Sequence, residues 1–271
     1  MKPLLISVLF VFLVFLIDCA SVPITGRSQL NLIDNAKVFP MSFSQYEQVK
    51  KEAAIITGTP ESDMIQRVGK RIQKSVEQYF EQEGQSQYLS DYAWEFNLIK
   101  DDAVKNAWCM PGGKVAFYTG IIPTCQDESG VAVVMGHEVA HAIANHGRER
   151  ISQQTASQVG LTALSIFLGG SANAAITNEM IMQGAGAATS VGILKFSRKH
   201  ESEADKLGLY FMAMAGYDPT AAPTFWERMS SGDGQEPPEF ISTHPSHKSR
   251  IKDLNKNMPK ALAYYKAANK N

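Results

Sequence analysis

The most constraining feature of the chain is the apolar stretch VVMGHEVAHAI at residues 133–143, which contains two histidines and a glutamate. Its pattern predicts a helix. His137 and His141 are four residues apart, so a helix places both imidazoles on one face, about one turn apart. Burying these polar groups without partners would cost several kcal/mol. A metal ion held by the two histidines is therefore the simplest explanation of this helix.

Glu138 follows the first histidine and lies at the adjoining edge of the same helix face. A carboxylate in this position can hold a metal-bound water and accept its proton. The ordinary alternative is an exposed helix with two hydrated histidines and an ion-paired glutamate. The apolar neighbours argue against that alternative, because such residues are usually buried.

His146 is one candidate for a third ligand, but its spacing is unfavourable. It comes five residues after His141, so a straight helix turns it away from the metal face. We expect His146 to lie near the C-terminus of the helix and to interact with the last carbonyls, not to bind the metal.

Glu201 and Asp205 are the better candidates, because they are four residues apart in the stretch FSRKHESEAD and share a helix face. Glu203 lies on roughly the opposite side. One of the two acids could bind the metal while the other supports a ligand histidine through a hydrogen bond. On spacing alone, a charged and solvated helix face is an equally good interpretation.

The remaining patterns predict a mainly helical α+β domain with a small β-sheet. Apolar spacing favours helices within 42–83, and alternation favours strands within 92–102 and 114–119, the second entered through a Pro-Gly-Gly turn. Further helices are expected at 127–145, 151–167 and about 194–214, with Asp127 as a cap and Gly147 as the stop of the first. The Gly- and Ala-rich stretch 169–193 could form loose helices, a cover over the site or a membrane-contacting segment.

The charge balance argues against a nucleic-acid partner. The 271 residues contain 26 Lys and Arg against 27 Asp and Glu, for a net charge of −1. No basic stripe is available to neutralise phosphates. A chain of this length can bury a sizeable core in one or two domains.

The N-terminus predicts export. Lys2 precedes an almost wholly apolar run at 4–17, which is too short to span a bilayer comfortably and fits an export signal over 1–18. Cys19 resembles the lipidated cysteine of a bacterial lipoprotein, although Asp18 departs from the small residue usual there. We expect a lipid-anchored tether at 19–41 and the domain at 42–271, in a periplasmic protein anchored to the outer membrane.

The other cysteines, Cys109 and Cys125, form an even pair in a chain expected to enter an oxidising compartment. A disulfide between them and two free thiols are both compatible with the sequence.

Five motifs in order give the chain a specific resemblance: NAWCMPGG, HEVAH, ESEAD, AGYDP and STHP. Together they resemble the gluzincin family of HtpX and the CAAX prenyl proteases, and most of all its exported bacterial LoiP- and BepA-like members, over about 42–254. The resemblance implies a zincin-type fold and one zinc ion bound by His137, His141 and Glu201. It also implies that Glu138 is the general base and that Asp205 orients a ligand.

The same resemblance implies a substrate-facing strand within 106–118, which would hold an extended peptide by strand addition. The residues singled out in this region are Asn106, Pro111, Gly112 and Gly113.

His244, in the stretch ISTHPSHKSRI, matches the His-Pro position of the family. It could donate a hydrogen bond to the oxyanion, or act as a fourth ligand in a resting enzyme, and the ordinary alternative is a solvated loop histidine. We expect Arg250 to fix this loop through a carboxylate pair. His200 and His247 have no assigned role.

The function expected from these features is zinc-dependent endopeptidase activity on misfolded or surplus cell-envelope proteins. The substrate class rests on family analogy alone. Two alternatives remain. One is an envelope chaperone or assembly factor on a protease fold, and the other is a different zinc hydrolase such as a small-molecule amidase.

Overall fold

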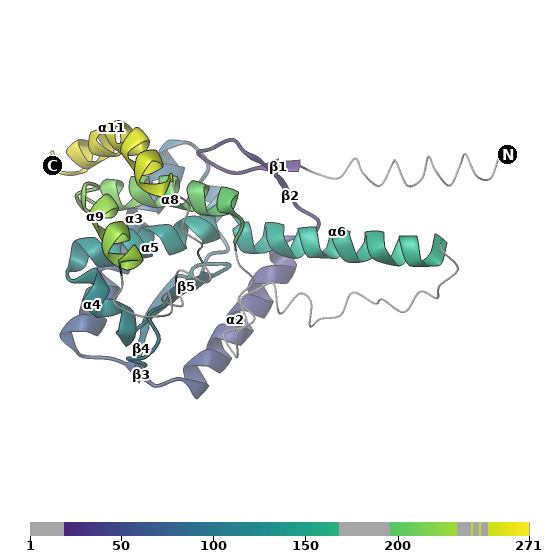
Figure 1. Cartoon of the computed structure of the whole chain (residues 1–271), viewed down its shortest axis with the longest axis horizontal. Helices are drawn as coiled ribbons and strands as arrows, with labels where there is room; N and C mark the ends of the chain where they lie inside the picture. Colours follow the sequence, from purple (N-terminus) through teal and green to yellow (C-terminus); the bar gives the residue numbers. More distant parts are fainter. Residues whose placement is uncertain (1–18, 168–195, 232–239, 241–243, 245–248, 271) are drawn as a thin grey trace.

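The computed structural model describes residues 19–167, 196–231, 240, 244 and 249–270, which form a helical domain with a small sheet (Figure 1). The expected export signal, the stretch 169–193 and His247 lie outside the described residues. Among the described helices, none combines the length and apolar character needed to cross a membrane.

The architecture is mainly helical, which confirms the fold class expected from the sequence. The helices are α2 (Asn35–Glu52), α3 (Pro60–Gln82), α4 (Ile122–Cys125), α5 (Glu128–Ile143), α6 (His146–Phe167), α8 (Arg198–Met214), α9 (Ala221–Ser230) and α11 (Arg250–Ala268). The strands are β1 (Cys19–Ser21), β2 (Ser28–Leu30), β3 (Ile55–Ile56), β4 (Glu95–Ile99), β5 (Ala107–Met110) and β6 (Lys114–Tyr118), and short 3-10 turns cover Ser86–Leu89 and Thr119–Ile121.

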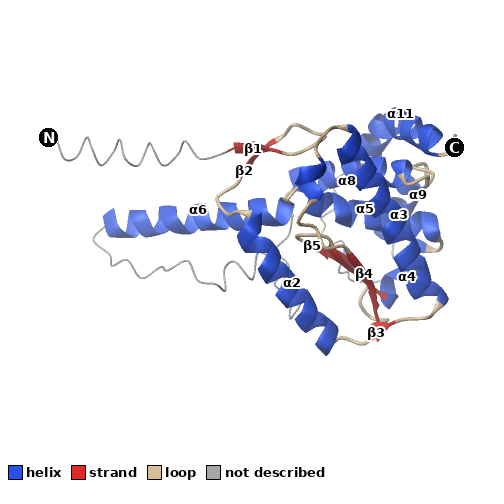
Figure 2. Cartoon of the chain, turned by 180° about the vertical axis from the view of Figure 1, so that it is seen from behind, coloured by secondary structure: helices blue, strands red, loops and turns tan. Residues whose placement is uncertain are grey.

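The main sheet has the strand order β3-β4-β6-β5, with β4 and β6 parallel and the other neighbours antiparallel. The two strands expected from the sequence are β4 and β6, and they lie in one small sheet as predicted, where they are direct neighbours. Figure 2 shows the sheet between α2 on one side and the helices around α5 on the other. Phe96 and Leu98 of β4 are 3% and 1% exposed and lie in the core with α3 and α5. The opposite face packs through Tyr46 of α2.

The turn between β5 and β6 is built from Pro111, Gly112 and Gly113. The two glycines have φ values of 84° and 88°, a backbone region that residues with a Cβ rarely adopt. A Cβ would also come within 2.5 Å of the Phe43 ring at Gly112 and of the Trp94 ring at Gly113. Both positions therefore need glycine, and the turn sets β5 at the edge of the sheet.

Helix α5 is the central element of the domain. The Asp127 carboxylate accepts a hydrogen bond from Gly130 N at 2.9 Å, which confirms the expected cap. Every residue from Gly130 to Ile143 is buried. At its other end, the carbonyls of Ala142 and Ile143 accept hydrogen bonds from tyrosine hydroxyls, those of Tyr92 and Tyr88. The helix is thus hydrogen-bonded at both ends, at an exposed N-cap and at a C-terminus buried in the core.

The expected stop at Gly147 is wrong, because α5 already ends at Ile143. Asn145 has a φ of 53°, and Asn is one of the few residues with a Cβ that adopts this left-handed conformation readily. The chain turns there, and α6 starts at His146 instead of residue 151. Gly147 lies inside α6, so His146 is the first residue of a new helix.

Residues 19–41 do not form the extended tether expected from their polar composition. They include the hairpin β1–β2 and the first turns of α2. Val22 and Val38 are 1% and 0% exposed, and Leu32 N donates a hydrogen bond to Ser152 Oγ of α6 at 3.0 Å. This segment therefore packs on the domain. Cys109 and Cys125 are both free thiols, so the disulfide alternative is not formed.

Helices α5 and α8 touch through their backbones at Gly136 and Gly208. A Cβ at Gly208 would lie 2.7 Å from His137 N, and a Cβ at Gly136 would lie 2.7 Å from Gly208 O. Glycine at both positions lets the helix that carries HEVAH approach the helix that carries Glu201. This crossing sets the separation of the histidines from the acids of α8.

We expect Gly208→Ala to force α5 and α8 apart and to lower the free energy of unfolding by about 1–3 kcal/mol, as overpacking does. Thermal unfolding of the variant measures this loss. Lys206→Ala, a change at a partly exposed position of the same helix, is the control. A Gly208→Ala protein as stable as the Lys206→Ala protein would show that the helices tolerate a wider crossing.

Candidate metal centre

Four buried side chains point their ligand atoms at one another in the centre of the domain. They are His137 and His141 of α5, Glu201 of α8, and His244, and the atoms all lie within 4.8 Å of each other. All four side chains are at most 3% exposed. The sequence patterns singled out each of these residues, and the fold brings them together from segments more than one hundred residues apart.

Five of the six separations between the ligand groups are close to those of a tetrahedral site. His137 Nε2 lies 3.1 Å from His141 Nε2 and 3.2 Å from His244 Nδ1. The oxygens of Glu201 lie 3.1–3.5 Å from the three histidine nitrogens. A tetrahedral zinc ion with ligands about 2.0–2.1 Å away needs ligand atoms about 3.3 Å apart. The donor set and its spacing therefore fit zinc.

The His137 ring is supported from behind by Asp205. His137 Nδ1 lies 3.0 Å from Asp205 Oδ1, so the carboxylate stands at the ring nitrogen that faces away from the cluster. Arg250, at the start of α11, donates from Nε to Asp205 Oδ2 at 2.7 Å and from Nη2 to Glu201 Oε2 at 2.9 Å. The guanidinium also lies 3.9 Å from the centre of the Trp226 ring. Arg250 thus joins Glu201 and Asp205, and these two acids form the carboxylate pair expected for it.

His146 lies behind His141, not at the helix carbonyls as expected. Its Nδ1 is 2.9 Å from His141 Nδ1, and its Nε2 is 2.9 Å from Glu203 Oε2. His146 is fully buried, and burial lowers its pKa to about 4. His146 is not among the four residues that converge, but it contacts one of them directly.

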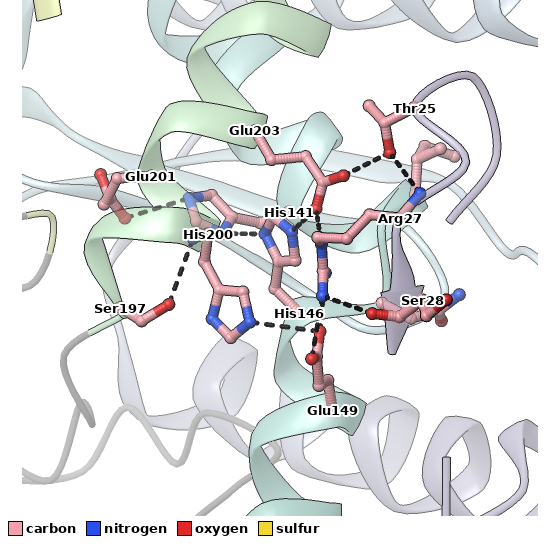
Figure 3. Close-up of polar contacts among 12 residues, drawn as sticks. Thr25, Arg27, Ser28, His141, His146, Glu149, Ser197, His200, Glu201 and Glu203 are labelled. Carbon is pink, nitrogen blue, oxygen red and sulfur yellow. Dashed lines mark hydrogen bonds and ion pairs between the residues drawn. The ribbon is translucent and has the colours of Figure 1, made fainter. Parts of the chain in front are cut away.

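Glu203 does lie on the side of α8 away from Glu201, as the spacing predicts, but it is not solvated. Its side chain is 6% exposed, because the β1–β2 hairpin covers this side of α8. Arg27 donates from Nε to Glu203 Oε2 at 2.6 Å, and Thr25 donates to Glu203 Oε1 (Figure 3). Burial favours the neutral acid, but the hydrogen bonds from His146, Thr25 and Arg27 outweigh it and lower the pKa of Glu203 to about 2.

Glu149 of α6 belongs to a second polar cluster beside the first, which it forms with Thr25, Arg27, His146, His200 and Glu203. Arg27 donates from Nη1 and Nη2 to its two carboxylate oxygens at 2.9 and 2.7 Å, and His200 Nε2 lies 3.2 Å from Glu149 Oε2. Burial acts against ionisation, but the hydrogen bonds from His200 and Arg27 prevail and lower the pKa of Glu149 to about 2. His200 therefore has a structural partner that the sequence did not suggest.

Glu138 stands beside the converging atoms without joining them. It is 2% exposed, and burial raises its pKa. The backbone N–H of Cys109 in β5 donates to the carboxylate, and Glu138 Oε1 lies 3.6 Å from His244 Nε2. Glu138 Oε1 has no hydrogen-bond partner, so it can accept a proton or a hydrogen bond from an arriving group.

Aromatic rings surround the cluster. The His244 ring stacks on Phe240 with the ring centres 4.5 Å apart, and Phe196 stacks on His141 at 3.9 Å. Trp226 lies edge-on to His137 at 5.3 Å. These rings exclude water from the histidines and limit how they can turn.

Strand β5 is an edge strand of the sheet and lies beside the cluster. Tyr118 N donates to Asn106 O, so by alternation Ala107 and Cys109 point their backbone groups away from β6. Asn106 is buried, and its side-chain oxygen accepts a hydrogen bond from Ala107 N at 2.9 Å. Pro111, Gly112 and Gly113 lie in the turn after the strand and not along its edge.

Sequence reasoning missed Arg27, Thr25, Glu149 and the contacts of His146 and Glu203. The available signal was weak: His146 and Glu149 are three apart, and Glu203 follows Glu201 by two. Nothing local to these positions indicates that a hairpin more than one hundred residues earlier covers them.

Comparison with known proteins places this geometry in a family. The family model described as Peptidase family M48 matches residues 67–258, which include α5, α8 and the start of α11. The match therefore covers most of the chain and every residue of the four-membered cluster.

Individual relatives agree with the family model. The chain is 41% identical to the mitochondrial metalloendopeptidase OMA1 of Schizosaccharomyces pombe over 177 residues, 64% of this chain and 49% of that protein. It is 29% identical to the human metalloendopeptidase OMA1 over 89% of this chain and 46% of that protein. It is 31% identical to the β-barrel assembly-enhancing protease of Escherichia coli over 59% of this chain and 33% of that protein.

The chain thus spans half or less of the length of these three relatives, two of which are mitochondrial proteins of eukaryotes. The family model includes both helices that carry His137, His141 and Glu201, and it also includes His244. The chain belongs to Peptidase family M48.

Proposed function

We propose that the chain is a zinc-dependent endopeptidase in which His137, His141 and Glu201 bind the metal. The observation that carries this proposal is the convergence of buried ligand atoms at separations of 3.1–3.5 Å in a chain of a peptidase family. Two histidines and a glutamate are a typical donor set of a catalytic zinc site. A metal cation would offset the cost of burying the charge of Glu201 at this site.

Zinc at this position would supply Lewis acidity toward a peptide carbonyl and toward water. Glu138 is placed to act as the general base. Its free Oε1 accepts the proton of the attacking water and returns it to the nitrogen of the leaving amine. Burial raises the pKa of Glu138, which brings the carboxylate closer to the range in which it can both accept and release a proton.

Strand β5 is the proposed substrate strand. An extended peptide can pair with the outward carbonyl groups of Ala107 and Cys109 by strand addition, since the N–H groups of these residues already donate to Asn106 and Glu138. Asn106 holds the start of the strand through hydrogen bonds with Ala107 and Tyr118. The turn at 111–113 holds its end, because Phe43 and Trp94 pack against the two glycines. Glu138 accepts from the Cys109 N–H, so the same edge orients the base.

His244 occupies the fourth corner of the cluster, where a catalytic zinc site keeps an open position for water. We propose that His244 is the resting ligand and that it leaves this corner when substrate binds. A resting enzyme of this kind would cut slowly. The same geometry therefore favours a second candidate function, a chaperone or assembly factor with gated proteolysis.

We further propose that the chain acts in the cell envelope on misfolded or surplus proteins, as an exported lipoprotein of the bacterial branch. The cationic and apolar start of the chain and the position of Cys19 support export and lipidation. The similarity to a β-barrel assembly-enhancing protease supports an envelope substrate.

Glu138→Gln is expected to keep stoichiometric zinc while cleavage of an unfolded protein such as casein falls by about 10²–10⁴-fold, because the base is lost. Glu201→Ala is expected to lose the zinc itself. Metal content and cleavage rate of the purified proteins measure both effects. Glu128→Gln is the matched control, since it makes the same change at the exposed start of α5. Retention of zinc by Glu201→Ala would refute the assignment of the third ligand.

His244→Ala is expected to retain zinc and to cleave casein faster than the wild type, because the fourth corner is then open to water. The measurement is the initial rate at equal zinc loading. The double variant with Glu138→Gln should be inactive, which would show that the added activity comes from the same site. A slower His244→Ala enzyme would instead assign His244 to stabilisation of the oxyanion.

Cys19→Ser is expected to move the chain from the membrane fraction of an expressing bacterial cell to the soluble fraction, because a lipid anchor cannot form. Fractionation followed by immunoblotting measures the distribution. Cys109→Ser changes a cysteine inside the domain and should not alter it. A Cys19→Ser chain that stays with the membrane would rule out anchoring through this residue.

A further inference from the structure

The β1–β2 hairpin is connected to His141 by an unbroken chain of polar contacts. The steps are Arg27 Nε to Glu203 Oε2 at 2.6 Å, Glu203 Oε2 to His146 Nε2 at 2.9 Å, and His146 Nδ1 to His141 Nδ1 at 2.9 Å (Figure 3). The Arg27 side chain is 12% exposed, Glu203 6% and His146 0%. The contacts lie inside the domain, where solvent does not screen them.

The direction of each hydrogen bond follows from the groups involved. A guanidinium only donates, so Glu203 accepts from Arg27 as a carboxylate. Glu203 Oε2 then accepts from His146, which requires a proton on His146 Nε2. A neutral imidazole carries one proton, so His146 Nδ1 must be the acceptor of the contact with His141.

His141 is therefore the donor in its contact with His146, and its proton is held on Nδ1. This leaves the lone pair of His141 on Nε2, the nitrogen that lies 3.1 Å from His137 Nε2 inside the cluster. A metal ligand needs this tautomer, and the hydrogen bond at the other ring nitrogen selects it.

The opposite ligand is supported in a parallel way. Arg250 donates to Asp205, and Asp205 lies at Nδ1 of His137. In each case an arginine from outside α5 and α8 pairs with a carboxylate of α8, and that carboxylate contacts a histidine of α5 directly (Asp205) or through His146 of α6 (Glu203). The chain to His141 has one more member, His146, because Glu203 is on the far side of α8.

We propose that Arg27 and Glu203 are positioning residues for the metal centre, and that they act through His146 to fix the tautomer and the ring of His141. The β1–β2 hairpin then contributes to the function of the site and does not only stabilise the fold. Thr25 and Arg27 hold both oxygens of Glu203, so the loop of the hairpin sets its orientation. The inference rests on the proposed function, which assigns His141 as a metal ligand.

The test compares Glu203→Gln, Arg27→Gln and Arg27→Lys with the wild type in the full chain. Glu203→Gln keeps the size of the side chain. Its amide can donate as well as accept a hydrogen bond, so it no longer determines which nitrogen of His146 carries the proton. The matched control is Arg67→Gln, which removes an arginine–carboxylate pair on the surface, between α3 and α5. Two readouts are used besides activity. They are the zinc dissociation constant from chelator competition and the side-chain ¹⁵N shifts of the six histidines, which report tautomers.

We expect Glu203→Gln to weaken zinc binding by about 10–100-fold and Arg27→Gln by about tenfold, the range found for groups that support metal ligands. The ¹⁵N spectra of both variants without zinc should show His141 as a mixture of tautomers. Arg27→Lys keeps the charge and should restore part of the affinity. Arg67→Gln should bind zinc as the wild type does.

Unchanged zinc affinity and histidine shifts in Glu203→Gln would overturn the inference, and the cluster would then serve folding alone. If Arg27→Gln does not fold, as circular dichroism would show, Glu203→Gln decides by the same criterion. A wild-type chain that binds no zinc would refute the proposed function instead. The two failures are therefore distinguishable.

Discussion

The structure depends on the backbone contact between α5 and α8 at Gly136 and Gly208. Because the two backbones touch there, Glu201 of α8 reaches to within 3.5 Å of His137 of α5. Every other element can be understood from this crossing. The sheet and α3 cover α5, α11 covers α8, and both helices lose contact with water along most of their length. The close contact is thus the origin of the burial as well as of the ligand geometry.

Burial on this scale creates an electrostatic problem. Glu138, Glu201 and Asp205 lie within one desolvated region, together with Glu149 and Glu203 on its far side. Buried carboxylates without cations would be strongly destabilising. Two arginines from opposite ends of the described chain, Arg27 and Arg250, each pair with two of these acids. The segments that carry Arg27 and Arg250 therefore both pack over the centre, and the proposed metal ion would compensate the negative charge that the arginines leave.

Local spacing in the sequence correctly predicted which residues share a helix face. It did not predict the contacts made by segments that are distant in the sequence. His137 and His141 are four residues apart, as are Glu201 and Asp205, and this spacing predicts that each pair shares a helix face. In the structure both histidines contact Glu201, and Asp205 contacts His137. The same reasoning placed Glu203 on the correct side of α8 but could not say that Arg27 would cover it. Helix ends were also missed, because the left-handed turn at Asn145 depends on one residue and on its packing, not on a repeating pattern.

His244 is held differently from the other three members of the cluster, which are His137, His141 and Glu201. His137 and Glu201 are tied to Arg250, and His141 is tied through His146 to Arg27. Among the described residues, His244 contacts members of the site itself and the rings of Phe240 and Phe196, and the only arginine-paired carboxylate that it contacts is Glu201 of the cluster. Contact with aromatic rings is a weaker restraint than a buried ion pair. If one ligand must exchange for water, His244 is the ligand whose departure costs the least.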